Sequence, residues 1–187
     1  MIVISTSSDQ VTQALSVYAA SFARSIGSLK TRLHTPSARA TDIDQVLGVY
    51  PQSDVCFFGH GASTPSPGLL CDGGSVAPTN VALLHGRKLV ATACNGDLFG
   101  PMVSQIGGNF LGYTGSLVVG LVSTRLHAAA EHAFLTGPRA VAAGTSVDAA
   151  SRQVRRAFSA LANQLSAGKN GPLPALMLMN GYGSCHW

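Results

Sequence analysis

The chain has 187 residues, of which 46% are hydrophobic and 11% are charged, and its formal net charge is +4. This length suits one domain, residues 1–187, and so apolar a chain buries a large core rather than remaining disordered. The densest basic cluster, Arg152, Arg155 and Arg156, lies on a predicted amphipathic helix, where a solvated face explains it better than a nucleic-acid site does.

Neither a leader nor a membrane segment is predicted. The opening residues, MIVIST, lack the basic stretch and long apolar core of a secretion signal. The longest apolar run, around Leu117 to Val122, is too short to cross a bilayer. The four cysteines lack the spacing of a disulfide framework or a zinc site, although Cys71, Cys94, Cys185 and His186 together could ligate zinc. We therefore expect a cytoplasmic protein with no metal, cofactor, nucleic-acid or membrane partner.

The first part of the chain alternates between strand and helix. Residues 2–6 form an apolar run typical of a buried strand, and apolar residues then recur at helical spacing from Val11 to Ile26. Ser8 or Asp9 can cap this helix, and Gly27 ends it. A second strand is predicted at Lys30–Thr35.

The same alternation continues to the end of the chain. The next predicted elements are a short helix capped by Thr41, a strand leading to His60, a Gly- and Pro-rich loop at 61–78, a short helix at 81–85 and a strand leading to Cys94. They are followed by a helix with Pro101 in its first turn, a strand at Asn109–Tyr113 and an apolar run at Leu117–Val122 that could be strand or helix. The chain then has predicted helices at 124–136 and 147–166 and a last strand at Ala175–Met179. This order predicts a three-layer, doubly wound α/β fold with a mostly parallel sheet of about six strands and helices on both faces.

Two of the predicted strands end in residues with catalytic chemistry. The runs 54–61 and 88–96 are apolar at consecutive positions, as in parallel strands covered on both faces, and they carry His60 and Cys94 at their ends. The carboxyl ends of neighbouring parallel strands form the crevice in which such sheets bind ligands. An imidazole beside a thiol there can take the proton while the sulfur attacks a carbonyl carbon. We expect the backbone N–H groups of Gly61 and Cys94 to form the oxyanion hole.

At these residues the chain resembles the caspase-like superfamily of cysteine peptidases, which includes caspases, gingipains and CHAT domains. Residues 57–61, Phe-Phe-Gly-His-Gly, and 89–94, Leu-Val-Ala-Thr-Ala-Cys, match the two catalytic blocks in order. The resemblance implies a His–Cys dyad, an acyl-enzyme intermediate and a protein or peptide substrate. It also implies a bacterial effector that an activating protein partner switches on.

The rest of the resemblance is less specific. Asn95–Phe99 is similar to the stretch after the gingipain nucleophile, while Phe134–Gly137, leading into the helix from Val147, and Ala175–Gly181, as a closing strand, are similar to CHAT domains. The residues after Cys94 are not the Cys-Arg-Gly of animal caspases, which argues against specificity for aspartate.

The sequence says less about the substrate pocket than about the two catalytic residues. Asp72 and Asp97 are the acids nearest the site, and they favour a basic or small residue before the cleaved bond. Asp97 can equally cap the helix that follows Cys94.

The alternatives to a peptidase are a catalytically inactive peptidase-like module that binds a partner, and a flavodoxin-like domain that binds a small molecule. The second is disfavoured because no glycine-rich phosphate loop follows the first strand.

Overall fold

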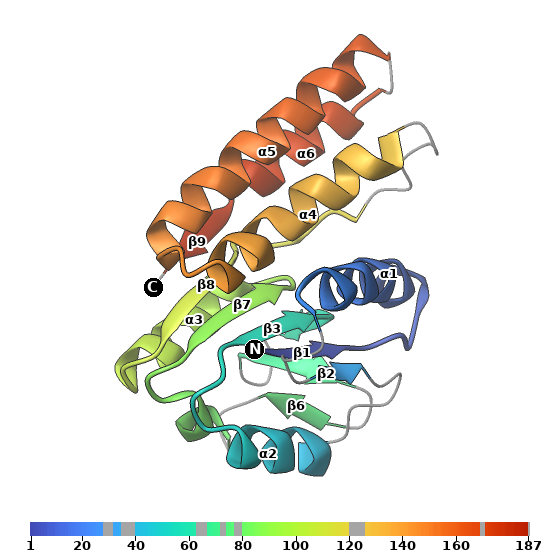
Figure 1. The fold of residues 1–187 in the computed structure, drawn as a ribbon. Coiled ribbons are helices and arrows are strands. Elements are labelled where there is room, and N and C mark those ends of the chain that lie inside the picture. The colour runs from blue at the N-terminus through green and yellow to red at the C-terminus, as the bar shows by residue number, and fades with distance from the viewer. Residues whose placement is uncertain are drawn as a thin grey trace.

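The structure is a computed structural model that describes residues 1–27, 32–34, 40–62, 67–71, 74–76, 80–119, 126–168 and 171–186. The described residues form a six-stranded sheet in the order β2-β1-β3-β7-β8-β9, with helices on both faces (Figure 1). The strands are β1 (Ile2–Ser5), β2 (Arg32–His34), β3 (Val55–Phe58), β7 (Lys88–Thr92), β8 (Asn109–Tyr113) and β9 (Ser184–His186). Neighbours from β2 to β8 are parallel, and β9 pairs antiparallel to β8. The predicted α/β class and mostly parallel sheet are confirmed.

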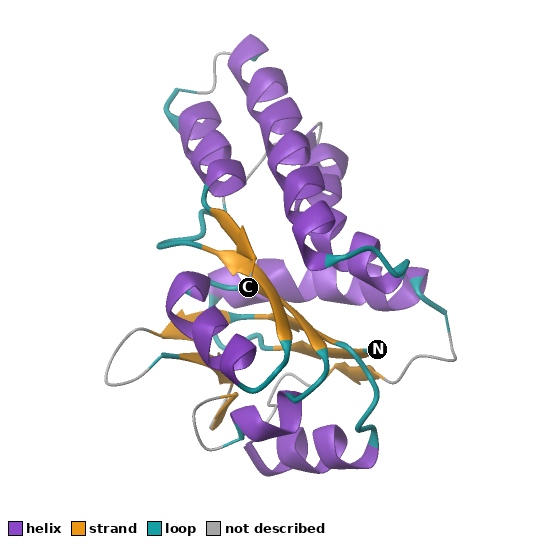
Figure 2. Cartoon of the chain, turned by 90° about the vertical axis from the view of Figure 1, so that its left-hand side faces the viewer, coloured by secondary structure: helices purple, strands orange, loops and turns teal. Residues whose placement is uncertain are grey.

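Residues alternate between the two faces of this sheet and supply two separate cores. Cys56, Phe58 and Val90 face the first core, whereas Val55 and Phe57 face the second. The first core is covered by α1 (Gln10–Ser25), α4 (His127–Ala142), α5 (Val147–Ala167) and α6 (Leu173–Tyr182). The second is covered by α2 (Ala40–Val49), η1 (Val81–Leu84) and α3 (Gly96–Gln105). Figures 1 and 2 show α5 and its neighbours extending beyond the sheet.

Several predicted elements are confirmed with small changes at their ends. Asp9, rather than Ser8, caps α1, and Gly27 follows that helix with φ 80°. The predicted strand at Lys30–Thr35 is observed as β2, and its remaining residues lie outside the described part of the chain. The ambiguous run at Leu117–Val122 is irregular as far as residue 119, and residues 120–122 are likewise not among those described.

The prediction that residues 61–78 form a loop is wrong for the described part of this range. Its described residues contain a second, antiparallel sheet of β4 (His60–Ala62), β5 (Gly68–Cys71) and β6 (Gly74–Val76). Leu69 and Val76 are buried in the second core. Strands of three or four residues that include glycine carry too little apolar pattern to be recognised in a sequence.

The predicted last strand at Ala175–Met179 is also wrong, because this segment lies within α6. Pro172 caps this helix, and Pro174 lies in its first turn, where the missing N–H costs no hydrogen bond. The two prolines are therefore a helix-start signal. The part of the CHAT resemblance that rested on a closing strand at Ala175–Gly181 does not hold.

Two other helices differ from the prediction at their ends. The helix after Cys94 begins at Gly96, so Pro101 lies in its interior instead of its first turn. The predicted helix at 124–136 is observed as α4, which continues through Pro138 to Ala142.

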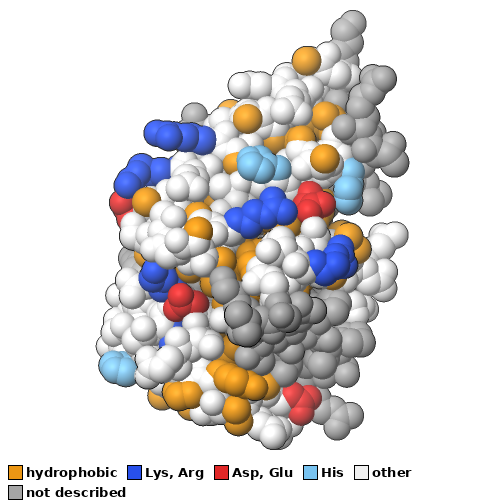
Figure 3. All heavy atoms as spheres, viewed as in Figure 1, with side chains coloured by type: hydrophobic (Ala, Val, Ile, Leu, Met, Phe, Trp, Pro, Cys, Tyr) orange, Lys and Arg blue, Asp and Glu red, His pale blue; other side chains and the backbone are white. Residues whose placement is uncertain are grey.

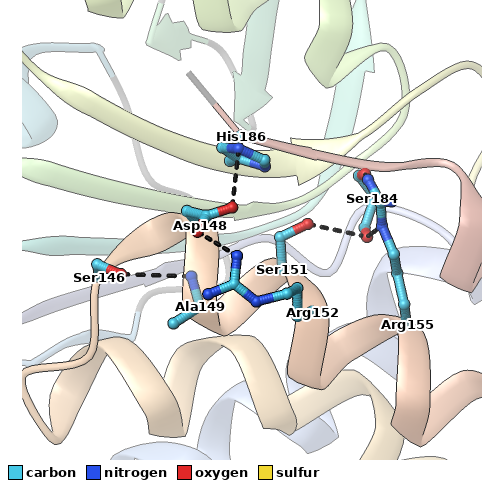
Figure 4. A network of polar contacts seen from close by, with 8 residues as sticks. All are labelled: Ser146, Asp148, Ala149, Ser151, Arg152, Arg155, Ser184 and His186. Carbon is cyan, nitrogen blue, oxygen red and sulfur yellow. Dashed lines mark hydrogen bonds and ion pairs between the residues drawn. The ribbon is translucent and has the colours of Figure 1, made fainter.

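The C-terminal strand β9 is attached to α5 by a network of polar contacts (Figure 4). Arg155 Nη2 donates to the backbone carbonyl of Ser184 at 2.8 Å, and the Ser184 hydroxyl lies 3.3 Å from that of Ser151. His186 Nε2 lies 3.2 Å from Asp148 Oδ1. These contacts explain how a three-residue strand remains in register beside β8.

Membrane and nucleic-acid binding would each require a particular kind of helix or surface. Among the described helices, none is both long and apolar enough to cross a bilayer. On the face drawn in Figure 3, the coloured Lys and Arg side chains are dispersed among uncharged atoms and lie beside acidic ones.

Candidate active site

The site lies at the carboxyl edge of three consecutive strands of the large sheet. β1, β3 and β7 are neighbours and all parallel, and each is followed by a polar residue: Asp9 after β1, His60 after β3 and Cys94 after β7. The prediction that His60 and Cys94 end neighbouring parallel strands at one edge is confirmed. The parallel pairing thereby brings together three residues that are far apart in the sequence.

The same three residues belong to one face of the sheet. Cys94 packs against the first core, and His60 contacts Asp9. Asp9 is the N-cap of α1, which covers this face. The carboxylate, the imidazole and the thiol are therefore arranged in the order of their strands along one edge.

The contact between Asp9 and His60 is the best-defined interaction of the site. Oδ2 of Asp9 lies 2.5 Å from Nε2 of His60, and both side chains are partly exposed. The other carboxylate oxygen, Oδ1, accepts a hydrogen bond from the backbone N–H of Thr12 at 2.9 Å. The Thr12 hydroxyl in turn accepts the N–H of Asp9, which completes a capping box. The helix cap thus holds the carboxylate that binds His60.

The electrostatics of Asp9 follow from these bonds. The Thr12 backbone N–H, followed by the His60 ring, lowers the pKa of Asp9 from 3.8 to about 2. Asp9 is therefore a carboxylate throughout the physiological range. A carboxylate can only accept, so His60 carries a proton on Nε2, and in the neutral ring Nδ1 has the lone pair that can take the proton of a thiol.

The backbone beside His60 is in contact with the backbone of Cys94. Gly59 N–H donates to the Thr92 carbonyl at 3.2 Å. A Cβ added to Gly61 would lie 1.7 Å from the carbonyl oxygen of Cys94 and 3.2 Å from its nitrogen. The space beside the Gly61 Cα is thus filled by the Cys94 backbone. The glycine is needed because the two turns touch there, which also places both predicted oxyanion donors in one small region.

Cys94 lies in a tight turn between β7 and α3. Asn95, with φ 57°, is the one non-glycine residue of the described chain in the left-handed region, and it precedes the first residue of α3. Its N–H donates to the Gly115 carbonyl at 2.7 Å. The sulfur of Cys94 accepts a hydrogen bond from the backbone N–H of Leu117 at 3.2 Å. This turn holds the thiol at the strand end, facing the segment 114–118.

The segment 114–118 is fastened to α3 and α6. Asp97 Oδ1 accepts the Gly115 N–H at 3.3 Å. Asn180, which is only 4% exposed, binds both backbone groups of Val118: Oδ1 accepts the N–H at 3.1 Å, and Nδ2 donates to the carbonyl at 2.9 Å. Asn180 therefore holds the segment whose Leu117 N–H donates to the Cys94 sulfur.

The predicted substrate-binding acids have different outcomes. Asp97 is near Cys94 in the sequence and its side chain accepts the N–H of Gly115, so it supports the segment beside the site. The N-cap residue of α3 is Asn95 and not Asp97. Asp72 lies outside the described residues. Among the residues that are described, no three His, Cys, Asp or Glu side chains are grouped as metal ligands.

Sequence reasoning missed Asp9 as a partner of His60 and Asn180 as a support of the site. The position of Asp9 just after the first parallel strand was an available signal, because the other two site residues occupy the same kind of position. Asn180 had no such signal, because its segment was predicted as a strand.

Comparison with known proteins gives no match: no protein-family model fits the chain, and no curated protein or solved structure is significantly similar to it. The caspase-like resemblance therefore rests on the short sequence matches alone, of which residues 57–61 and 89–94 are the most specific.

Proposed function

We propose that the protein is a cysteine endopeptidase in which Cys94 is the nucleophile, His60 the general base and acid, and Asp9 the residue that orients His60. The observation that carries the proposal is the Asp9–His60 contact of 2.5 Å at the edge where the neighbouring strand ends in Cys94. A base held by a third group beside a nucleophile is the general pattern of covalent catalysis. The two blocks that resemble caspase-like peptidases supply the same pair of residues.

The reaction follows from the protonation state of His60. Nδ1 takes the thiol proton as the sulfur bonds to the peptide carbonyl carbon, and the carbonyl oxygen becomes an oxyanion that the N–H groups of Gly61 and Cys94 stabilise. The intermediate collapses by breaking the C–N bond, and the imidazolium gives its proton to the leaving amine. Water then attacks the thioester, giving one proton to His60, which returns it to the sulfur as the C–S bond breaks. Asp9 stays ionised throughout and stabilises the imidazolium.

The test is peptide cleavage by the purified protein. A library of peptides made by digesting a proteome is incubated with the wild type, Cys94→Ala, His60→Ala and Cys56→Ala, and new termini are identified by mass spectrometry. We expect the wild type to produce new termini and the first two variants to produce almost none, since each lacks one reacting group.

Cys56→Ala is the matched control, because Cys56 is fully buried in the first core and lies near the amino end of β3, opposite the edge at which His60 and Cys94 lie. It should cleave like the wild type while its free energy of unfolding falls by about 1–2 kcal/mol, as for a small core truncation. Equal cleavage by Cys94→Ala, or no cleavage by the wild type, would contradict the peptidase proposal.

A further inference from the structure

A cavity of about 640 Å³ lies between the segment 114–118 and α6. Ser116 and Val118 line one wall, and Leu176 and Met179 line the other, with Asn180 between them. Its volume is within the range of pockets that bind small ligands or side chains. No charged residue is among those that line it in the described chain.

The cavity adjoins the candidate nucleophile through a single segment of chain. Thr114, Gly115, Ser116 and Val118 line the cavity, and the segment that they belong to contacts the turn of Cys94. Leu117 N–H donates to the sulfur, and the Gly115 carbonyl accepts the N–H of Asn95. An extended peptide advances about 3.3 Å per residue, so a substrate attacked at Cys94 can place a side chain one or two residues away into this cavity.

The two walls of the cavity are joined by hydrogen bonds, and part of their apolar surface is exposed. Asn180 binds both backbone groups of Val118, and the Thr114 N–H donates to the Gly183 carbonyl at 2.6 Å, so the two walls are tied together. Met179 is nevertheless 65% exposed, the largest exposed fraction among the large hydrophobic side chains of the described residues. Covering such a flexible apolar side chain with another one is favourable.

We propose that this cavity is the specificity pocket of the peptidase and that it takes an apolar side chain, such as leucine, within two residues of the cleaved bond on its acyl side. This inference rests on the proposed function and adds the substrate class. It replaces the sequence-based expectation of a basic or small residue, because Asp97 binds Gly115 and is not part of the pocket lining.

The experiment measures the rate at which peptide chloromethyl ketones alkylate Cys94, as the sulfur displaces chloride. Three probes carry Leu-Leu, Lys-Lys or Asp-Asp before the ketone, and the modified cysteine is located by mass spectrometry. With the wild type, we expect the Leu-Leu probe to react at least about tenfold faster than the other two, since filling an apolar pocket discriminates by that much.

Met179→Glu places a carboxylate at the pocket, and Val49→Glu makes the same change at a similarly exposed position on α2, outside the pocket. We expect Met179→Glu to slow the Leu-Leu probe at least about tenfold and to speed the Lys-Lys probe, while Val49→Glu matches the wild type. Iodoacetamide, which has no side chain to place, should alkylate Cys94 equally in all three proteins.

The outcomes separate this inference from the proposed function. Equal rates for the three probes with the wild type, or equal effects of the two glutamate variants, would overturn the pocket while leaving the peptidase proposal standing. Alkylation of Cys94 that is unchanged by His60→Ala would overturn the proposed function, and the pocket assignment with it.

Discussion

At the scale of single residues, Asp9 has two roles that a conservative change can separate. Its Oδ1 caps α1, and its Oδ2 binds His60. In Asp9→Asn the amide oxygen keeps the cap, so the amide nitrogen faces His60 and donates to Nε2. The neutral ring then carries its proton on Nδ1, where it cannot accept the proton of Cys94.

We therefore expect Asp9→Asn to lower the cleavage rate at least about tenfold while the free energy of unfolding changes by less than about 1 kcal/mol. Asp148→Asn is the matched control, because Asp148 also lies in the first turn of a helix and binds a histidine, His186. It should leave the rate unchanged. A full rate in Asp9→Asn would show that Asp9 only caps α1.

The pKa of Asp9 also predicts how its contribution to stability depends on pH. A carboxyl with a lower pKa in the folded than in the unfolded chain stabilises the fold above its unfolded value, 3.8, and this contribution is lost as the pH falls towards about 2. Urea unfolding should therefore show the wild type losing stability relative to Asp9→Asn between about pH 4 and pH 2. A constant difference over that interval would contradict the assigned contacts.

The sequence was sufficient to place His60 and Cys94 after neighbouring parallel strands, because each ends a continuous apolar run. It was not sufficient to pair Asp9 with His60. An N-cap is a local signal, whereas this contact depends on the parallel pairing of β1 with β3, which joins residues about fifty positions apart. In the sequence, Asp9 was thus recognisable only as a helix cap.

At the scale of elements, the contact between the turns after β3 and β7 depends on Gly61. A methyl group there would meet the Cys94 carbonyl at 1.7 Å, and this neighbour is backbone that cannot rotate away. We expect Gly61→Ala to abolish cleavage and to lower the free energy of unfolding by about 1–3 kcal/mol, as for an overpacked site.

Gly48→Ala is the matched control for this change. Gly48 lies inside α2 with nothing within 4 Å of the added methyl, so alanine there should raise stability by about 0.5–1 kcal/mol. Circular dichroism melts and the cleavage assay measure both variants. Full activity in Gly61→Ala would mean that the two turns do not need their close contact.

Elements were predicted well where they are long and periodic, and poorly where they are short. The helix at 147–166 was predicted almost to the residue, because apolar positions recur at helical spacing over several turns. The run at Ala175–Met179 has apolar residues all round, so periodicity could not distinguish a helix from a strand, and the prolines before it were the decisive signal. The small strands β5 and β6 had neither signal.

At the scale of the whole molecule, the fold class followed from the alternation of apolar runs and helical segments, because short right-handed crossovers make consecutive strands parallel. The antiparallel β9 at one edge could not be predicted, since its three residues have no strand pattern and are held by Arg155 and the Asp148–His186 contact. The second sheet beside the site escaped prediction for the same reason. The architecture that brings Asp9, His60 and Cys94 to one edge was nevertheless implied by the order of the first strands.

If His60 activates Cys94, the rate at which iodoacetamide alkylates Cys94 at pH 7 must depend on His60. We expect His60→Ala to slow this rate at least about tenfold, whereas His186→Ala, which removes a histidine paired with Asp148 instead of Asp9, leaves it unchanged. Equal rates in the wild type and His60→Ala would contradict the account, because the thiol would then react without help from the imidazole.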